Sequence, residues 1–164
     1  MKINYLFRLT QIMLVVPMAL REWINFFTDI GQYQENIQVV HKIISFPTIE
    51  NANLLFNRSI NSELIAKIIP ITWIVVHFLA ALLMTIGILV LIRSFRTNIE
   101  IYQGRKNICL FGLALAFFWY ILTLGAGSMD YFFSWMQKIN FNGDISGYAI
   151  PVGIALIYLY FKEH

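Results

Sequence analysis

The sequence has few charged residues and almost no cysteine. Asp, Glu, Lys and Arg make up only 13% of its 164 residues, whereas about a quarter is usual for a soluble domain. Water would not tolerate the unburied apolar surface that such a composition leaves, so we expect a protein of the lipid bilayer. The single cysteine, Cys109, excludes a disulfide within the chain and any metal site built from cysteines.

Patterns that carry chemistry are also missing. Lys and Arg do not cluster with interleaved aromatic residues, so nucleic acid is not an expected partner. The histidines, His41, His77 and His164, lack the spacing of a metal site, and only His77 falls in an apolar segment, which leaves no second histidine to hold a haem. No catalytic triad, carboxylate pair or phosphate-binding glycine loop stands out. We therefore expect no enzyme, no metal and no cofactor.

Apolar residues are abundant, at 59% of the chain with a mean hydropathy of +0.66. Crossing a hydrocarbon core about 30 Å thick takes roughly 20 mostly apolar helical residues. Four segments qualify, namely residues 7–27, 68–92, 107–124 and 145–161. The sequence thus predicts an all-α membrane protein, a single domain over residues 1–164 built as a four-transmembrane-helix bundle, with the lipid bilayer as its first partner.

The basic residues predict the orientation of this bundle. Four spans place both termini and the loop 93–106 on one side, and that side holds most of the cations: Lys2, Arg8, Arg93, Arg96, Arg105, Lys106 and Lys162. Because cytoplasmic loops are rich in Lys and Arg, we expect both termini to be cytoplasmic. Arg8 and Arg21 are expected to reach out to opposite faces of the membrane.

The two outer loops, residues 28–67 and 125–144, each predict a short amphipathic helix. In the first, "ENIQVVHKII" repeats apolar residues at helical spacing before Pro47, which suits a helix lying on the membrane or capping the bundle. In the second, an aromatic stretch predicts an interfacial helix that would form an outer-face platform for lipids or a partner. The platform residues are Tyr131, Phe132, Trp135, Met136 and Gln137.

His77 is the sharpest candidate for a functional residue, because an ionisable side chain inside a span is costly and is a functional hypothesis by default. The structural interpretation is a neutral imidazole hydrogen-bonded to Tyr120, Thr123 or a backbone carbonyl. The functional interpretation is a proton relay or a ligand site. A quinone site that combines His77 with Trp73, Trp119 and Tyr120 is a further possibility.

The order of motifs along the chain is familiar. "YQENIQVVHKIISFPT" and "NRSI" precede a helix reading "ITWIVVHFLAALLMTIG", and "FFSWMQ" and "FNGD" follow the third apolar segment. This order resembles a bacterial family of predicted small integral membrane proteins, catalogued as domain of unknown function 2165. Members commonly carry an acid where this chain has His77. The loop motifs contain two further candidates, Asn36 and Arg58. The resemblance implies a location in a bacterial inner membrane, and it implies no activity.

Three functions fit these observations. The first is a non-catalytic accessory or scaffold component that acts through its outer loops and helix faces on a membrane-protein partner or on a second copy. The second is a small proton- or solute-coupled transporter or channel that uses His77. The third is a quinone- or lipid-binding subunit of a membrane redox enzyme.

Overall fold

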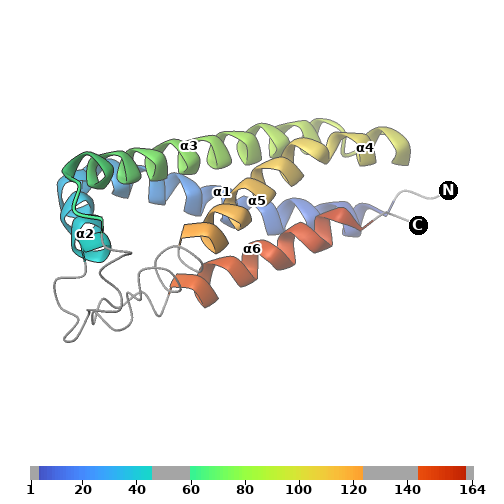
Figure 1. Cartoon of the computed structure of the whole chain (residues 1–164). Helices are drawn as coiled ribbons and strands as arrows, with labels where there is room; N and C mark the ends of the chain where they lie inside the picture. The colour runs from blue at the N-terminus through green and yellow to red at the C-terminus, as the bar shows by residue number, and fades with distance from the viewer. Residues whose placement is uncertain (1–3, 46–59, 124–143, 162–164) are drawn as a thin grey trace.

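The computed structural model describes residues 4–45, 60–123 and 144–161, and every regular element in them is a helix (Figure 1). The expected all-α fold is therefore confirmed for this part of the chain. The helices are α1 (Tyr5–Gly31), α2 (Tyr33–Ser45), α3 (Glu63–Arg93), α4 (Ile99–Arg105), α5 (Asn107–Tyr120) and α6 (Asp144–Tyr160). Helices α1, α3, α5 and α6 form an elongated bundle, with α2 at one end and α4 at the other (Figure 1). We refer to these as the α2 end and the α4 end.

The four segments expected as spans all fall on helices, although the helix bounds differ. Helices α1 and α3 begin earlier than expected because side chains cap their first turns: Asn4 accepts the N–H of Phe7 at 3.1 Å and Ser62 that of Ile65 at 3.4 Å. The segment 93–106, expected as a loop, contains helix α4. Its first turn is capped by Asn98, an example of the local capping chemistry that apolar periodicity does not detect.

Helix α2 is the amphipathic helix expected after the first span. Its buried residues Val40 and Ile44 pack with Ala66 of α3, and Trp73 lies partly buried against this group. The apolar side of α2 thus covers α3 at the α2 end. The second amphipathic helix, the platform residues of 125–144 and Arg58 lie outside the described residues.

Helices α3 and α5 approach closely at small residues. A Cβ atom on Gly112 would lie 2.7 Å from Met84 Cγ and 2.9 Å from Met84 N, and one on Gly87 would lie 2.7 Å from Cys109 N. Membrane helices commonly use such small residues to bring their backbones together. The close approach matters for function because α3 and α5 carry two members of the site described below.

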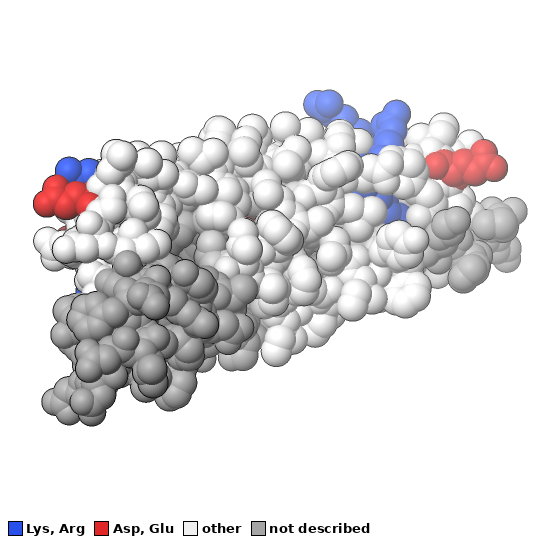
Figure 2. Space-filling model, in the orientation of Figure 1, with Lys and Arg blue, Asp and Glu red and all other residues white. Residues whose placement is uncertain are grey.

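The bundle exposes apolar side chains along its sides and buries a few charged ones within a mostly apolar core. The exposed apolar side chains of the long helices include Met13 and Ile24 of α1, Val75 of α3 and Ile154 of α6. Figure 2 shows charged side chains near the two ends and an uncharged band between them. Among the described residues, the buried polar and charged side chains are Arg8, Gln11, Glu22, His77, Ser94 and Lys106. Apolar sides on the outside of the bundle suit a lipid environment.

Two described helical stretches are long and apolar enough to cross a membrane, Glu63–Arg93 and Ile99–Thr123, and Ala149–Tyr160 is a shorter apolar helix. Helix α1 is long enough but its sequence includes several polar residues. Arg8 and Glu22 are two of these, and both are buried against other helices. These two residues lower the mean hydropathy of α1, although their side chains are buried and do not lie on the outer surface of the bundle.

Candidate functional site

A carboxylate, an imidazole and a phenol from three helices meet inside the bundle. Glu22 of α1 is 1% exposed and His77 of α3 is 8% exposed. Glu22 Oε2 lies 2.7 Å from His77 Nδ1, and the hydroxyl of Tyr120 on α5 donates a hydrogen bond to Glu22 Oε1 at 2.7 Å. One buried carboxylate therefore ties α1 to both α3 and α5.

A second carboxylate faces the other side of the same imidazole. Asp29, near the end of α1, places Oδ2 3.6 Å from His77 Nε2, beyond hydrogen-bond distance. Its Oδ1 accepts a long hydrogen bond, 3.4 Å, from Asn36 Nδ2 on α2. Asp29 Oδ2 is buried and accepts no hydrogen bond from any described residue. We call Glu22, Asn25, Asp29, His77 and Tyr120 the acid–His cluster.

Helical spacing explains why α1 supplies three members. Glu22, Asn25 and Asp29 stand three and then four residues apart, so they share one face of the helix. The amide of Asn25 donates to the Tyr120 hydroxyl at 2.9 Å, which in turn donates to Glu22. The phenol is thereby held with its proton directed at the carboxylate.

The cluster has a place for an additional proton. A neutral imidazole carries one N–H, so His77 can donate toward Glu22 or toward Asp29 but not toward both. Both contacts are favourable only when His77 is doubly protonated or when one carboxyl holds a proton. Burial raises the pKa of Asp29, which lies two residues beyond the apolar segment 7–27, above its ordinary value of 3.8, and the nearby His77 opposes this.

The geometry suits protons better than metal ions. The two ring nitrogens of His77 face different carboxylates on opposite sides of the ring, so Glu22 and Asp29 do not converge on one position. Within residues 4–45, 60–123 and 144–161, no group of three His, Cys, Asp or Glu side chains is arranged to hold a metal ion.

The structure brings together only some of the residues singled out in the sequence. His77 and Tyr120 are neighbours, with ring centroids 5.9 Å apart. Trp73 lies instead in the apolar group beneath α2. Trp119 directly precedes Tyr120, so its side chain leaves α5 about 100° away around the helix axis. Asn36, another residue singled out in the sequence, borders the acid–His cluster because it donates a hydrogen bond to Asp29.

The sequence reasoning missed Glu22 and Asp29. The hydrogen-bond partner expected for His77 was Tyr120, Thr123 or a carbonyl, whereas the structure pairs His77 with Glu22; Thr123 donates to the Trp119 carbonyl. A usable signal was present, because Glu22 falls within the segment 7–27 and a buried acid needs a partner.

A second buried polar group, the basic cluster, lies at the α4 end and is formed by Arg8, Tyr102 and Lys106. Arg8 Nη1 donates to the carbonyls of Phe95 and Thr97, both at 2.8 Å, just after α3 ends, and its guanidinium lies 4.3 Å over the Tyr102 ring. Arg8 is 0% exposed, so the expectation that it reaches out to the membrane surface was wrong. The carbonyls beyond a helix end need donors, and an inward guanidinium supplies them.

Lys106 likewise supplies hydrogen-bond donors to the carbonyls at the end of α6. Its Nζ donates to the carbonyls of Leu159 at 3.0 Å and Phe161 at 2.7 Å, in the last turn of that helix. A cation at a helix C-terminus is also favoured by the helix dipole. The basic cluster therefore joins α1, the segment that follows α3, helix α4 and the end of α6.

The described part of the chain is helical, with apolar side chains along its sides and a few charged ones inside, which suits the class of integral membrane proteins. A family model described as a predicted small integral membrane protein, domain of unknown function 2165, matches residues 7–162. The chain belongs to this family. No curated protein and no solved structure matches it.

Proposed function

We propose that this protein is a non-catalytic, four-span membrane component that takes up and releases protons at the acid–His cluster and so responds to pH. The observation that carries the proposal is the buried imidazole of His77 with a carboxylate facing each ring nitrogen. The titratable groups described around it are Glu22 and Asp29 from α1 and Tyr120 from α5. Each of these groups has a protonated and a deprotonated form, and in the proposed function the cluster's charge changes when one of them gains or loses a proton.

The position of the cluster supports access from the α2 end. His77 stands sixteen residues from Arg93, which is about 24 Å along α3 in a hydrocarbon core about 30 Å thick. The cluster would then lie in the half of the membrane nearer α2. Asp29 accepts a hydrogen bond from Asn36 of α2, so a change of charge in the cluster would alter the contact between the cluster and the helix that covers this end. An accessory role follows, in which the α2 end and the helix faces contact a membrane-protein partner or a second copy.

Four spans with cytoplasmic termini in a bacterial inner membrane form part of the proposal. The apolar outward side chains of α1 and α6 support crossing by these helices as well as by α3 and α5. The exposed cations Arg93, Arg96 and Arg105 of the α4 end support placing that end in the cytoplasm.

Cysteine labelling tests this orientation. In a Cys109→Ser background, Arg96→Cys should react with an impermeant maleimide only after the cells are permeabilised. Glu63→Cys, exposed at the α2 end, should react in intact cells. The opposite pattern would reverse the orientation, and labelling of both positions from one side would exclude this arrangement of spans.

Proton uptake tests the function itself. The purified full-length protein in nanodiscs is moved from pH 8 to pH 5 in weak buffer, and proton uptake per chain is measured. Wild type should take up about one proton more than Glu22→Gln or His77→Gln. Glu63→Gln is the control, because it also removes one carboxylate. Glu63 is exposed, so this substitution should remove only the proton uptake of an ordinary surface acid. If all three variants differ from wild type equally, the cluster has no special proton affinity and the proposal fails.

Proton-coupled transport is the second candidate function. Its specific support is the buried Asp29 Oδ2 without a hydrogen bond, which offers a further proton position between His77 and the α2 end. Proteoliposomes loaded with a pH-sensitive dye separate the two roles. A proton flux that His77→Gln abolishes would favour transport, whereas pH-dependent uptake without flux would favour the accessory role.

A further inference from the structure

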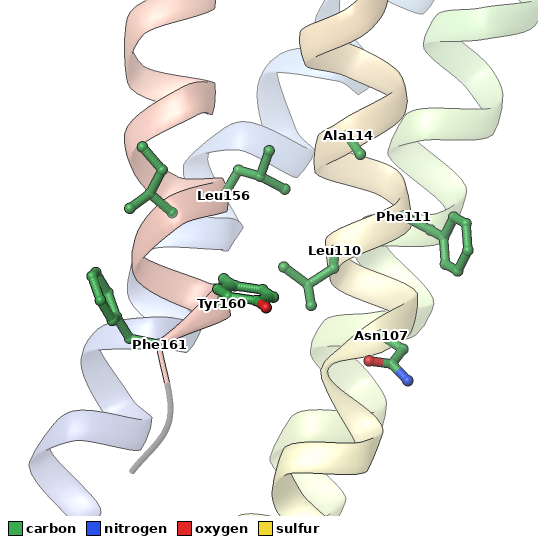
Figure 3. A pocket seen from close by; sticks show the side chains of 8 residues that line it. Asn107, Leu110, Phe111, Ala114, Leu156, Tyr160 and Phe161 are labelled. Atoms are coloured by element: carbon green, nitrogen blue, oxygen red, sulfur yellow. The ribbon is translucent and has the colours of Figure 1, made fainter. Parts of the chain in front are cut away.

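A groove between α5 and α6 lies at the α4 end, far from the acid–His cluster. Its volume is about 510 Å³, within the range of about 300–1,000 Å³ common for ligand sites. Figure 3 shows Leu110 of α5 and Tyr160 of α6 directed toward one another across it. The lining residues are Asn107, Leu110, Phe111, Ala114, Leu156, Ile157, Tyr160 and Phe161.

The lining indicates an apolar, elongated occupant. All but Asn107 are aliphatic or aromatic, and the groove opens between exposed side chains, including Phe111 and Ile157. In a protein of the membrane, such an opening faces the hydrocarbon of the bilayer. An acyl chain can enter it sideways without crossing water.

An exposed cation lies close in the chain to the polar residue of the groove. Arg105 is exposed and stands two residues before Asn107. Lys106 is buried, and its ammonium donates at 2.7 Å to the carbonyl oxygen of the lining residue Phe161, so Arg105 is the cation that a headgroup can reach. Basic groups beside a site between membrane helices select lipids with anionic headgroups.

We propose that the α5–α6 groove binds one acyl chain of a phospholipid whose anionic headgroup lies beside the exposed Arg105. The apolar lining accepts the chain, Asn107 marks the depth at which the headgroup begins, and Arg105 selects a negative phosphate-bearing group. This site is independent of the proton function, because no lining residue belongs to the acid–His cluster.

Native mass spectrometry of the full-length protein in detergent tests the chain-binding part. The probes are phosphatidylglycerol and phosphatidylcholine with identical acyl chains. Ile157→Trp should reduce retention of phosphatidylglycerol, because the larger side chain occupies the groove. Ile150→Trp is the matched control, since it lies two turns away on the same side of α6 and does not line the groove. Equal retention by both variants would overturn the site, and so would a dimer in wild type that Ile157→Trp dissociates, because a second copy would then be the occupant.

A second variant tests the headgroup part without altering the groove. Arg105→Gln should reduce the preference for phosphatidylglycerol over phosphatidylcholine by about fivefold. Arg96→Gln, which removes an exposed cation of the α4 end that precedes α4, should change it less. If wild type retains the two lipids equally, or if the two Arg variants act alike, selection of an anionic lipid by the groove is wrong.

Discussion

The two buried clusters, at opposite ends of one bundle, satisfy their charges in different ways. In the acid–His cluster, side chains bind side chains: Glu22 meets His77 and Tyr120. In the basic cluster, Arg8 and Lys106 donate to backbone carbonyls just beyond or at helix ends. A carbonyl oxygen does not take up a proton at physiological pH, so the acceptors in the basic cluster do not titrate. The acceptors in the acid–His cluster are carboxylates, which can hold a proton, and our proposal of a pH response therefore rests on that cluster.

The largest effect is expected from removing Glu22. Glu22→Ala leaves the buried Tyr120 hydroxyl without its acceptor and His77 without its closest partner, which should lower the free energy of unfolding by about 3–5 kcal/mol. Unfolding in mixed micelles with increasing SDS measures this. Glu63→Ala, at an exposed acid of the same end, should be close to wild type. A loss below about 1 kcal/mol for Glu22→Ala would mean that the cluster contributes little to the fold.

The basic cluster should respond to the loss of Lys106. Lys106→Met keeps an apolar stem but removes two charge-assisted bonds to the end of α6, so we expect a loss of about 1.5–3 kcal/mol. This loss should be the same at pH 5 and pH 8, in contrast to that of Glu22→Ala. Arg105→Met, its exposed neighbour, serves as the control, with an effect within about 0.5 kcal/mol. A strongly pH-dependent loss for Lys106→Met would remove the distinction between the clusters.

A double-mutant cycle sharpens the distinction further. Glu22→Gln combined with His77→Gln should show a coupling of about 0.5–3 kcal/mol, because the two side chains touch. Glu22→Gln combined with Lys106→Met should be additive within about 0.5 kcal/mol, because these residues lie in different clusters. Coupling across the clusters as large as coupling within one would show that the bundle responds as a whole.

The smallest effect concerns Asp29. Burial raises the pKa of its carboxyl in the folded protein, so the folded state binds this proton more tightly than the unfolded state. The resulting stabilisation is present at low pH and is lost as the pH rises from 3.8 through the raised pKa. Asp29→Asn should therefore be more stable relative to wild type as the pH rises through that interval. Parallel unfolding curves against pH for the two proteins would contradict this, and Glu35→Gln on α2 provides the control for an exposed acid.

Local features of the fold were predictable because they depend on neighbouring residues. The spacing of Ile37, Val40 and Ile44 indicated helix α2, and the long apolar segments indicated the long helices. Helix α4 was missed because it is short and begins with a cap at Asn98 rather than with apolar periodicity. Arg8 was misplaced because sequence alone does not reveal that helix-end carbonyls lie within its reach.

By itself, the sequence determined that this chain belongs in a membrane, that it is helical, and that His77 is an ionisable residue within an apolar helix. These properties follow from the composition and from the helical period of apolar residues, both of which can be read from short stretches of the sequence. Only the tertiary structure decided what His77 faces. Glu22 precedes His77 by 55 residues and Tyr120 follows it by 43, so the contact of these three side chains depends on how α1, α3 and α5 pack. No pattern within one helix encodes the packing that brings His77 together with Glu22 and Tyr120.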